Sequence, residues 1–188
     1  ASYAERRAEI VRQLAAKSQA EGLTPIEDEE LLDEVNSLVE RPNVLLCQFE
    51  EEFLEVPQEC LILTMKQNQK YFPLLDGAGK LTNKFLLVSN ITPDDASEVV
   101  GGNERVVRPR LADAKFFFET DKKKTLEARL SGLDKVVYHN QLGTQGERVL
   151  RVRELAKAIG NLLGGEAMAS LCDRAAQLAK ADLLTEMV

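Results

Sequence analysis

Residues 70–89 read KYFPLLDGAGKLTNKFLLVS, and this stretch decides the fold class of the chain. Two runs rich in aromatic and aliphatic side chains, 70–75 and 81–89, flank the turn sequence DGAG at 76–79. An Asp-Gly pair between such runs is a strong signal for a β-hairpin, because glycine adopts at little cost the positive φ angles that tight turns require. The sequence therefore predicts two antiparallel strands joined at 76–79.

Helices and strands are mixed on both sides of this hairpin. The short apolar run 44–49 is typical of a buried strand, and residues 135–140 are expected to be extended. Apolar residues at helical spacing predict helices over 4–19, 24–40 (starting at Thr24-Pro25), 57–67 (with Pro57 first) and 171–188, and a helical half that opens at 142–144 and is divided at Gly164-Gly165. No regular strand–helix–strand alternation occurs, so we expect the α+β class.

The helix expected after Asn103 contains a proline. Asn103 is suited to cap it, and apolar residues follow at helical spacing: Val107, Leu111, Ala114 and Phe118. Inside a helix, proline costs about 3 kcal/mol because it lacks an N–H donor and clashes with the preceding turn. The proline therefore fits this helix only if the helix starts at about Arg108, which places Pro109 in the first turn.

The composition is that of an ordinary soluble globular protein. The chain has 188 residues, 44% of them apolar, with 24 Lys and Arg against 31 Asp and Glu side chains, a net charge of −7. Its longest apolar runs are far shorter than the roughly 20 residues of a membrane span, so no membrane association is expected. An odd number of widely spaced cysteines (Cys47, Cys60 and Cys172) indicates reduced thiols in a cytoplasmic protein.

The charge is distributed unevenly along the chain. Residues 1–60 carry 5 basic and 15 acidic side chains, a net of −10, whereas residues 61–188 carry 19 basic and 16 acidic ones, a net of +3. Within 105–124 there are seven basic and three acidic side chains. Such a local basic stretch suits contact with a polyanion, because the near field matters more than the total charge. The alternative is a solvated helix face of mixed charge.

Catalytic motifs are absent from the sequence. Neither GxGxxG nor a Walker-type GxxxxGK[ST] occurs. The single histidine, His139, lies in an aliphatic-rich segment and is more typical of a structural residue, and the acidic run 50–52 is typical of a solvated rim. With one histidine and no CxxC, a structural zinc site is not expected. We expect no catalytic residue and no metal ligand in this chain.

Polar side chains surround aromatic rings in two stretches. Residues 66–72 read KQNQKYF, a mixture that suits phosphate contact and base stacking on a nucleic acid. Residues 102–118 combine an apolar stripe with an array of arginines, which match phosphate geometry. In the alternative interpretation, the rings pack in the core, the lysines are solvated, and the arginines pair with carboxylates of the same domain.

The second of these stretches resembles a known family. The sequence GNERV at 102–106, continuing into RLADAKFF at 110–117, is similar to the β subunit of the bacterial two-subunit glycyl-tRNA synthetase. Further similar stretches follow in the same order along the chain: TMK at 64–66, QKYFP at 69–73, VSN at 88–90, KVV at 135–137, LGT at 142–144 and KADLLTEMV at 180–188. The resemblance extends over essentially the whole chain.

The resemblance implies a division into two domains. It predicts that residues 1–135 form an α+β module like the B3/B4 domain of the phenylalanine enzyme's β chain. Residues 136–188 would be the incomplete beginning of a helical HD-type domain, and the chain an interior fragment of the N-terminal half of a longer subunit. HD phosphohydrolases hold a metal with a His and a His-Asp doublet, but here His139 is followed by Asn140.

The resemblance also implies a function. In this family the α subunit carries the chemistry that uses ATP (with Mg) and glycine, and the β subunit serves tRNA recognition and assembly. The expected partners are the α subunit and tRNA(Gly), in a cytoplasmic heterotetramer, and no cofactor is expected in this fragment. Two alternatives stay open: a degenerate HD-type, phosphohydrolase-like module, and a purely structural module without direct tRNA contact.

Five cations are the candidate tRNA contacts: Arg105, Arg108, Lys115, Lys66 and Lys70. In the expected helix, Arg108 and Lys115 share a face away from the apolar stripe, and Arg105 lies near the helix N-terminus, where backbone N–H groups favour an anion. Arg110 and Asp113 are three residues apart and are expected to pair with each other.

Overall fold

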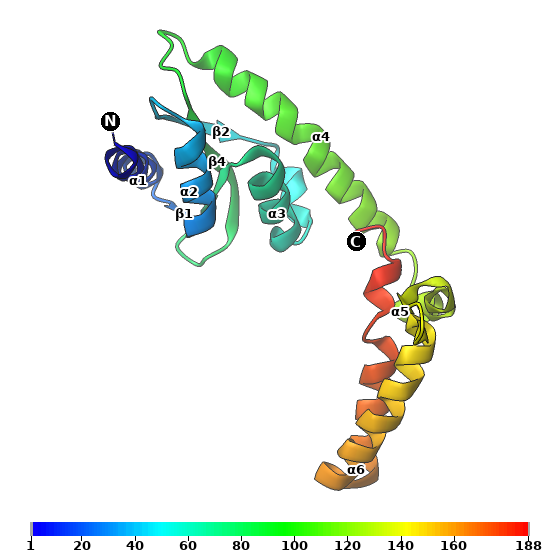
Figure 1. Cartoon of the computed structure of the whole chain (residues 1–188). Coiled ribbons are helices and arrows are strands. Elements are labelled where there is room, and N and C mark those ends of the chain that lie inside the picture. Colours follow the sequence, from blue (N-terminus) through cyan, green and yellow to red (C-terminus); the bar gives the residue numbers. More distant parts are fainter. Residues whose placement is uncertain (1, 188) are drawn as a thin grey trace. The chain divides into compact units, whose positions relative to one another are not determined.

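The computed structural model describes residues 2–187, and the chain divides into two compact units between Phe116 and Phe117. The first unit contains a sheet covered by helices, whereas the second is mainly helical (Figure 1). The α+β class that the sequence predicts is thereby confirmed. The domain boundary expected between 135 and 136 follows from the family resemblance rather than from compactness, and it stays a prediction.

Four antiparallel strands form the sheet of the first unit, in the order β1-β3-β4-β2. The elements of this unit are, in chain order, α1 (Tyr3–Ala20), β1 (Thr24–Pro25), α2 (Glu29–Leu38), β2 (Asn43–Gln48), the 3-10 helix η1 (Glu51–Glu55), α3 (Gln58–Gln69), β3 (Phe72–Leu75), β4 (Leu81–Ser89) and α4 (Ser97–Asp121), which continues into the second unit.

The β3–β4 hairpin confirms the prediction from residues 70–89. In its turn, the Asp76 carboxylate accepts hydrogen bonds from the backbone amides of Lys80 (2.9 Å) and Ala78 (2.8 Å), which lowers the pKa of that carboxyl. Gly79 has a φ of +76°, in the region where a side chain is disfavoured. The hairpin is therefore closed by the hydrogen bonds of the Asp76 carboxylate and by the positive φ of Gly79.

Helices cover both faces of the sheet, because its strands alternate two sets of apolar side chains. One set packs with α1 and α2 in a common core: Ile10, Leu14, Leu31, Leu32, Val35, Val39, Val44, Phe72, Leu74 and Leu86. The buried side chains of the other face come from β2, β4, α3 and α4: Leu45, Cys47, Phe85, Leu87, Leu61, Met65, Val107 and Leu111. The first unit is thus a helix–sheet–helix sandwich (Figure 1).

The acidic helix expected over 24–40 begins later than predicted. Thr24 and Pro25 instead form β1, which pairs with β3, and the amide of Ile26 donates to the carbonyl of Pro73 (3.1 Å). The helix α2 starts at Glu29 because the Asp28 carboxylate accepts from the amide of Leu31 (2.9 Å) and caps its N-terminus. The prediction overlooked this cap.

The next long helix starts at neither position that the sequence suggested, a cap at Asn103 or a first turn at about Arg108. α4 runs from Ser97 to Asp121 with Pro109 in its interior. The proline is exposed, whereas Val107 and Leu111 on either side of it are fully buried. Burial of two such side chains contributes several kcal/mol, about as much as an interior proline costs, so the helix continues through it.

The second unit is built around a helical hairpin. Besides the end of α4, its elements are α5 (Leu126–Arg129), the 3-10 helix η2 (Leu130–Lys135), β5 (Val137–His139), β6 (Gly143–Thr144), α6 (Gln145–Leu178) and the 3-10 helix η3 (Ala181–Leu184). α6 is interrupted at Gly164 and at Gly165, whose φ is +68°, so the predicted division there is confirmed. The two arms of α6 are antiparallel (Figure 1, yellow to red).

The arms of α6 approach each other closely. A Cβ added at Gly160 would lie 2.9 Å from the sulfur of Cys172 and 3.0 Å from the carbonyl oxygen of Met168. Arg153 on the first arm forms two hydrogen bonds with the carboxylate of Asp173 on the second (2.7 and 3.0 Å). The glycine and the ion pair therefore fix how the arms pack.

The end of the described chain returns to α4. The Asp121 carboxylate accepts from a guanidinium N–H of Arg129 (3.0 Å) and from the amides of Glu186 (2.9 Å) and Met187 (3.1 Å). The continuous helix expected over 171–188 is wrong, because α6 ends at Leu178 and η3 follows. No helix within residues 2–187 is long and apolar enough to cross a membrane.

Candidate nucleic-acid interface

The GNER stretch attaches α4 to the sheet. The Glu104 carboxylate accepts from the amide of Gln48 at the end of β2 (2.9 Å). The side-chain Oδ1 of Asn103 accepts from the Tyr71 hydroxyl (2.7 Å), while its side-chain Nδ2 donates to the backbone carbonyl of Val99 (2.8 Å). Two residues that the sequence placed in a candidate RNA-binding stretch thus hold this helix in position.

Two candidate cations continue the same line of contacts. Arg108 Nε lies 2.6 Å from a carboxylate oxygen of Glu50, and Lys115 Nζ lies 2.9 Å from Glu52 and 3.5 Å from Glu55. The hydrogen bond to Glu52 is the main reason why the pKa of Lys115 is raised. All three pairs lie at the surface, where solvent screening leaves ion pairs little net stability. The alternative interpretation, in which arginines of this stretch pair with carboxylates of the same domain, is thus realised at Arg108.

Arg105 has a different environment. Its side chain is exposed, its Nε donates to the carbonyl of Gly101 (3.2 Å), and within residues 2–187 it forms no ion pair with a carboxylate. The argument from a helix N-terminus is wrong for this residue, because α4 begins two turns earlier, at Ser97. The expected pair between Arg110 and Asp113 is also wrong, since no ion pair joins them in the described part of the chain.

Lys66 and Lys70 face α2. Lys66 pairs with Asp28, and Lys70 Nζ lies 2.9 Å from a carboxylate oxygen of Glu34. The pKa of Asp28 is lowered, first by the amide of Leu31 and then by Lys66. These two lysines thus lie close together beside α2. Their carboxylate partners differ from those of Arg108 and Lys115.

The rings expected to stack on bases are not accessible. Tyr71 and Phe72 are each only 2% exposed, and the Tyr71 ring lies 4.6 Å, between centroids, from that of Phe85. Burial raises the pKa of Tyr71 to about 12 and that of the neighbouring Cys47 to about 12. The alternative interpretation, in which these rings pack in the core, is confirmed.

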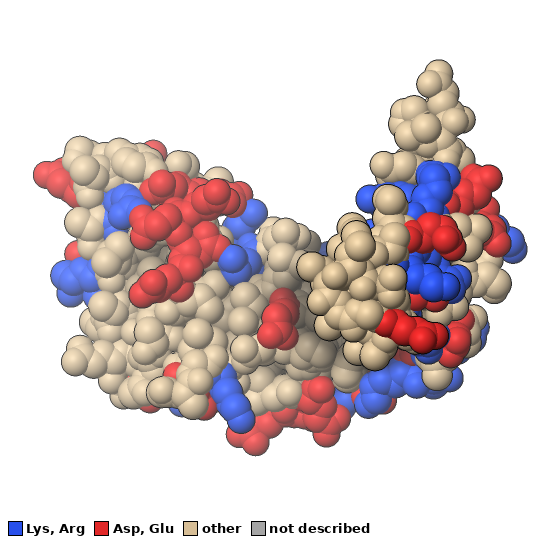
Figure 2. Space-filling model, turned by 90° about the horizontal axis from the view of Figure 1, so that it is seen from below, with Lys and Arg blue, Asp and Glu red and all other residues tan. Residues whose placement is uncertain are grey.

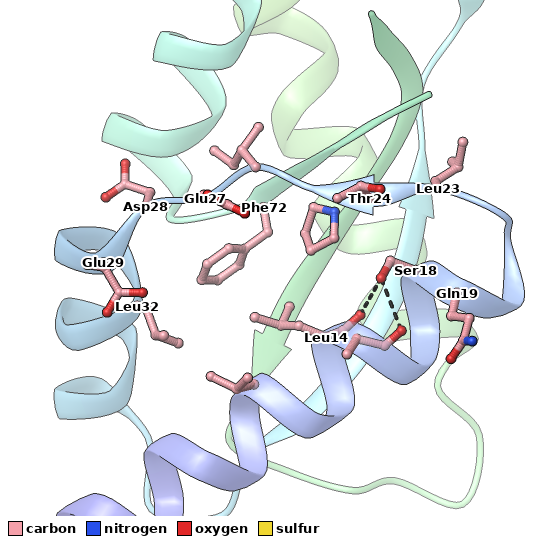
Figure 3. Close-up of a pocket in the computed structure, with 14 residues that line it drawn as sticks. Leu14, Ser18, Gln19, Leu23, Thr24, Glu27, Asp28, Glu29, Leu32 and Phe72 are labelled. Atoms are coloured by element: carbon pink, nitrogen blue, oxygen red, sulfur yellow. Dashed lines mark hydrogen bonds between the residues drawn. The ribbon is translucent and has the colours of Figure 1, made fainter. Parts of the chain in front are cut away.

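A cavity of about 590 Å³, which the sequence did not indicate, opens between α1 and α2 (Figure 3). Leu14, Leu32 and Phe72 line it, and the Ser18 hydroxyl there bonds to the carbonyls of Leu14 and Ala15. Three consecutive carboxylates also line it: Glu27, Asp28 and Glu29. Because these charges repel phosphate, the cavity does not suit a nucleic acid.

The two units differ in charge. The first, up to Phe116, holds 13 basic and 21 acidic side chains, a net of −8, and the second holds 11 basic and 10 acidic ones, a net of +1. On the face of the first unit seen in Figure 2, acidic side chains form a connected group flanked by a few basic ones, whereas on the second unit the two signs alternate. The second unit therefore repels a polyanion less than the first.

The described residues contain no clustered metal ligands. Among residues 2–187, no group of three or more His, Cys, Asp and Glu side chains is placed to hold a metal ion. His139 is exposed, and its Nδ1 accepts from the amide of Gln141 (3.1 Å). The candidate site therefore consists of surface cations, such as Arg105 and Arg108, and of residues that hold α4 on the sheet, such as Asn103 and Glu104.

Comparison with known proteins identifies the family. A profile of the family described as "Glycyl-tRNA synthetase beta subunit" matches residues 1–188. The chain is 77% identical over 188 residues to the protein named "Glycine--tRNA ligase beta subunit" of Thiobacillus denitrificans, 72% over 190 residues to that of Delftia acidovorans, and 73% over 194 residues to that of Dechloromonas aromatica. Each alignment covers 100% of this chain but 27% of the relative. This chain therefore belongs to the family of glycyl-tRNA synthetase β subunits and spans about a quarter of the length of these relatives.

Proposed function

We propose that this chain serves tRNA recognition and subunit assembly in a cytoplasmic, two-subunit glycine–tRNA ligase. The partner α subunit would bind ATP with Mg, and glycine, and carry out the aminoacylation chemistry, in a heterotetramer with the β subunit. The observation that carries this proposal is the match to the family along the whole chain, at 77% identity to one relative.

The tRNA contacts that we propose are the five cations identified in the sequence. Arg105 is the first of them, because its guanidinium is exposed and has no carboxylate partner among residues 2–187. Arg108 and Lys115 would exchange their exposed glutamates for phosphates, since surface ion pairs are weak. Lys66 and Lys70 form a second group that would have to leave Asp28 and Glu34.

The competing candidate function is purely structural. The pair between Arg108 and Glu50 supports it, because the same side chain that would meet a phosphate already holds α4 against the residues after β2. The first function predicts that tRNA contacts residues of this chain, whereas the structural function predicts that it contacts only other parts of the enzyme.

The experiment is photo-crosslinking of tRNA(Gly) to the intact two-subunit enzyme, followed by mapping of the linked peptides. Cross-links to peptides within residues 1–188 are expected, and a non-cognate tRNA at the same concentration is the control. If tRNA binds the enzyme but no cross-link falls in this segment, the structural function is the correct one.

A second measurement addresses the division of chemistry. The isolated chain should show no glycine-dependent ATP–pyrophosphate exchange, with the intact enzyme as the positive control. Exchange above background in the isolated chain would contradict the assignment of the chemistry to the α subunit.

A further inference from the structure

An exposed aromatic ring lies under a guanidinium in the second unit. Tyr138 on β5 is 40% exposed, and the guanidinium carbon of Arg148, in the second turn of α6, lies 4.4 Å from the centre of its ring. At this distance the cation is attracted to the face of the ring and limits its rotation. The ring is therefore held in place while much of the residue stays accessible.

A second arginine contacts the hairpin that carries this ring. Arg151 follows Arg148 by three residues, so both side chains leave α6 on the same side, and Arg151 Nη2 donates to the carbonyl of Leu142 in the β5–β6 turn (3.2 Å). We call Tyr138, Arg148 and Arg151 the Tyr138 platform. Its two arginines come from a helix and its ring from a hairpin, so the folded unit brings them together.

The turn is itself well fixed. The amide of Leu142 donates to the carbonyl of His139 (3.0 Å), and Gly143, with a φ of +89°, leads into β6. The amide of Gln145 donates to the carbonyl of Val136 (2.8 Å), which ties the start of α6 to the start of the hairpin. The platform is therefore preorganised.

The platform arginines are not neutralised by carboxylates. Within residues 2–187, neither Arg148 nor Arg151 forms an ion pair, in contrast to Arg108, Lys115, Lys66 and Lys70 of the first unit.

Three carboxylates lie close to the platform arginines in the sequence, and none of them forms an ion pair with either arginine in the described structure. Glu147 accepts from the amide of Thr144 (2.8 Å) in a capping box at the start of α6. An oxygen of Asp134 lies against the backbone of Gly146, 2.0 Å from where a Cβ would be. Glu154 is exposed and forms no ion pair with Arg151 in the described structure. In the described structure the two platform arginines therefore contact only uncharged groups: the Tyr138 ring and Gln145 for Arg148, and the carbonyl of Leu142 for Arg151.

Two further apolar side chains of the hairpin are exposed, Val137 at 67% and Leu142 at 55%. An accessible ring and arginines without carboxylate partners are features with which proteins hold an unstacked base and its phosphates.

We infer that the Tyr138 platform binds an unpaired nucleotide of the tRNA, with the base stacked on Tyr138 and the flanking phosphates at Arg148 and Arg151. This inference rests on the proposed function and deepens it, because it names a contact that differs from the five cations above. An RNA is favoured over a protein partner because the platform holds two arginines without carboxylate partners in a unit that is not acidic.

The test measures tRNA(Gly) affinity against salt concentration with the intact two-subunit enzyme. Tyr138→Leu removes the ring but keeps an apolar side chain, and it should weaken binding about tenfold, as expected for one lost stacking contact, without changing the salt slope. Tyr138→Phe keeps the ring and should bind as the wild type does. Arg151→Ala should weaken binding and flatten the salt slope by about one unit. Lys157→Ala, an exposed cation further along α6, is the matched control and should leave affinity and slope nearly unchanged.

Three results overturn the inference or its basis. Wild-type affinity of Tyr138→Leu, while tRNA cross-links still map to residues 1–188, ends the inference and leaves the proposed function intact. An absence of cross-links from the whole segment ends the proposed function itself. If Tyr138→Leu weakens association with the α subunit while the assembled enzyme binds tRNA normally, the platform is a protein contact. Thermal unfolding of both Tyr138 variants shows that they are folded.

Discussion

Arg108 Nε on α4 lies 2.6 Å from a carboxylate oxygen of Glu50, two residues beyond the end of β2. Two further contacts flank this pair: Glu104 accepts from the amide of Gln48, and Lys115 pairs with Glu52. Successive residues along α4 therefore contact successive residues of the segment 48–52. An arginine proposed to meet a phosphate therefore already has an anionic partner, and any tRNA must compete with it.

The first prediction uses that competition. In the intact enzyme, Glu50→Gln should strengthen tRNA binding, because it frees the Arg108 guanidinium, whereas Arg108→Ala should weaken binding and flatten the salt slope by about one unit. Affinity is measured against salt for both variants, together with thermal unfolding. Arg12→Ala is the control, since this exposed arginine pairs with Glu9 within α1, on the other face of the sheet from α4. Lower stability of Arg108→Ala with an unaltered slope would mean that the pair is structural only.

The second prediction concerns Glu104. Its carboxylate accepts from the backbone amide of Gln48, so Glu104→Ala leaves that amide without a protein partner and should cost about 1–2 kcal/mol of unfolding free energy. Glu104→Gln retains an acceptor oxygen and should lose less than half of that. Denaturant unfolding measures both variants. Equal losses in the two would show that the carboxylate charge, rather than the hydrogen bond, matters.

The third prediction concerns the C-cap of α3. Lys70 has a φ of +57°, a left-handed conformation in which a side chain costs about 1 kcal/mol relative to glycine. Lys70→Gly should therefore raise the unfolding free energy by about 0.5–1 kcal/mol, although it removes the exposed pair with Glu34. Lys70→Ala loses the same pair without relieving the backbone and should not stabilise. If Lys70→Gly instead lowered the unfolding free energy, the ion pair with Glu34 would contribute more stability than the backbone conformation costs.

The fourth prediction compares two glycines. Gly160→Ala places a methyl group 2.9 Å from the sulfur of Cys172 and should cost about 1–3 kcal/mol by forcing the arms of α6 apart. Gly101→Ala lies in α4 with no neighbouring atom within 4 Å of the new Cβ and should stabilise by about 0.5–1 kcal/mol, because alanine favours helix. Thermal unfolding distinguishes them. A neutral Gly160→Ala would show that the arms separate easily.

The fifth prediction concerns alkaline pH. Burial raises the pKa of Cys47 from 9.0 to about 12 and that of Tyr71 from 10.0 to about 12. Between pH 9 and 12 the folded state therefore holds protons that the unfolded state has lost, so the unfolding free energy falls as pH rises through this window and is unaffected below it. Denaturant unfolding from pH 7 to 11 measures this. Cys47→Ala should reduce the slope, and an unchanged slope would exclude Cys47 as its source.

Much of the fold follows from local sequence chemistry. The hairpin depended on the turn at 76–79, the break in α6 on two adjacent glycines, and the class on the mixture of patterns. The errors occurred where tertiary packing overrides a local signal. Burial of Val107 and Leu111 carries α4 through Pro109, and pairing with β3 draws Thr24 and Pro25 out of the expected helix.

The candidate site was less predictable, for a different reason. The sequence shows which side chains carry charge, but not which distant carboxylate each will meet. Glu50 is 58 residues from Arg108 in the chain, and Arg148 meets Tyr138 only because a hairpin folds back on α6. Arg148 and Arg151 belong to the short basic run RVLRVR at 148–153, but Tyr138 lies ten residues before Arg148, so no local pattern joined the ring to the arginines.

One of the contacts that fix α4 also covers part of the outer edge of the sheet. β2 is an edge strand, and two of its amides are covered by side chains: the amide of Val44 donates to Gln13 of α1 (2.8 Å), and that of Gln48 donates to Glu104 (2.9 Å). An exposed apolar edge strand is a template on which another chain can add a strand and begin to aggregate. With an acceptor at each end of β2, an incoming strand finds no continuous row of donors. Glu104, which positions α4, therefore also blocks one end of this edge strand against strand addition, and Gln13 of α1 blocks the other.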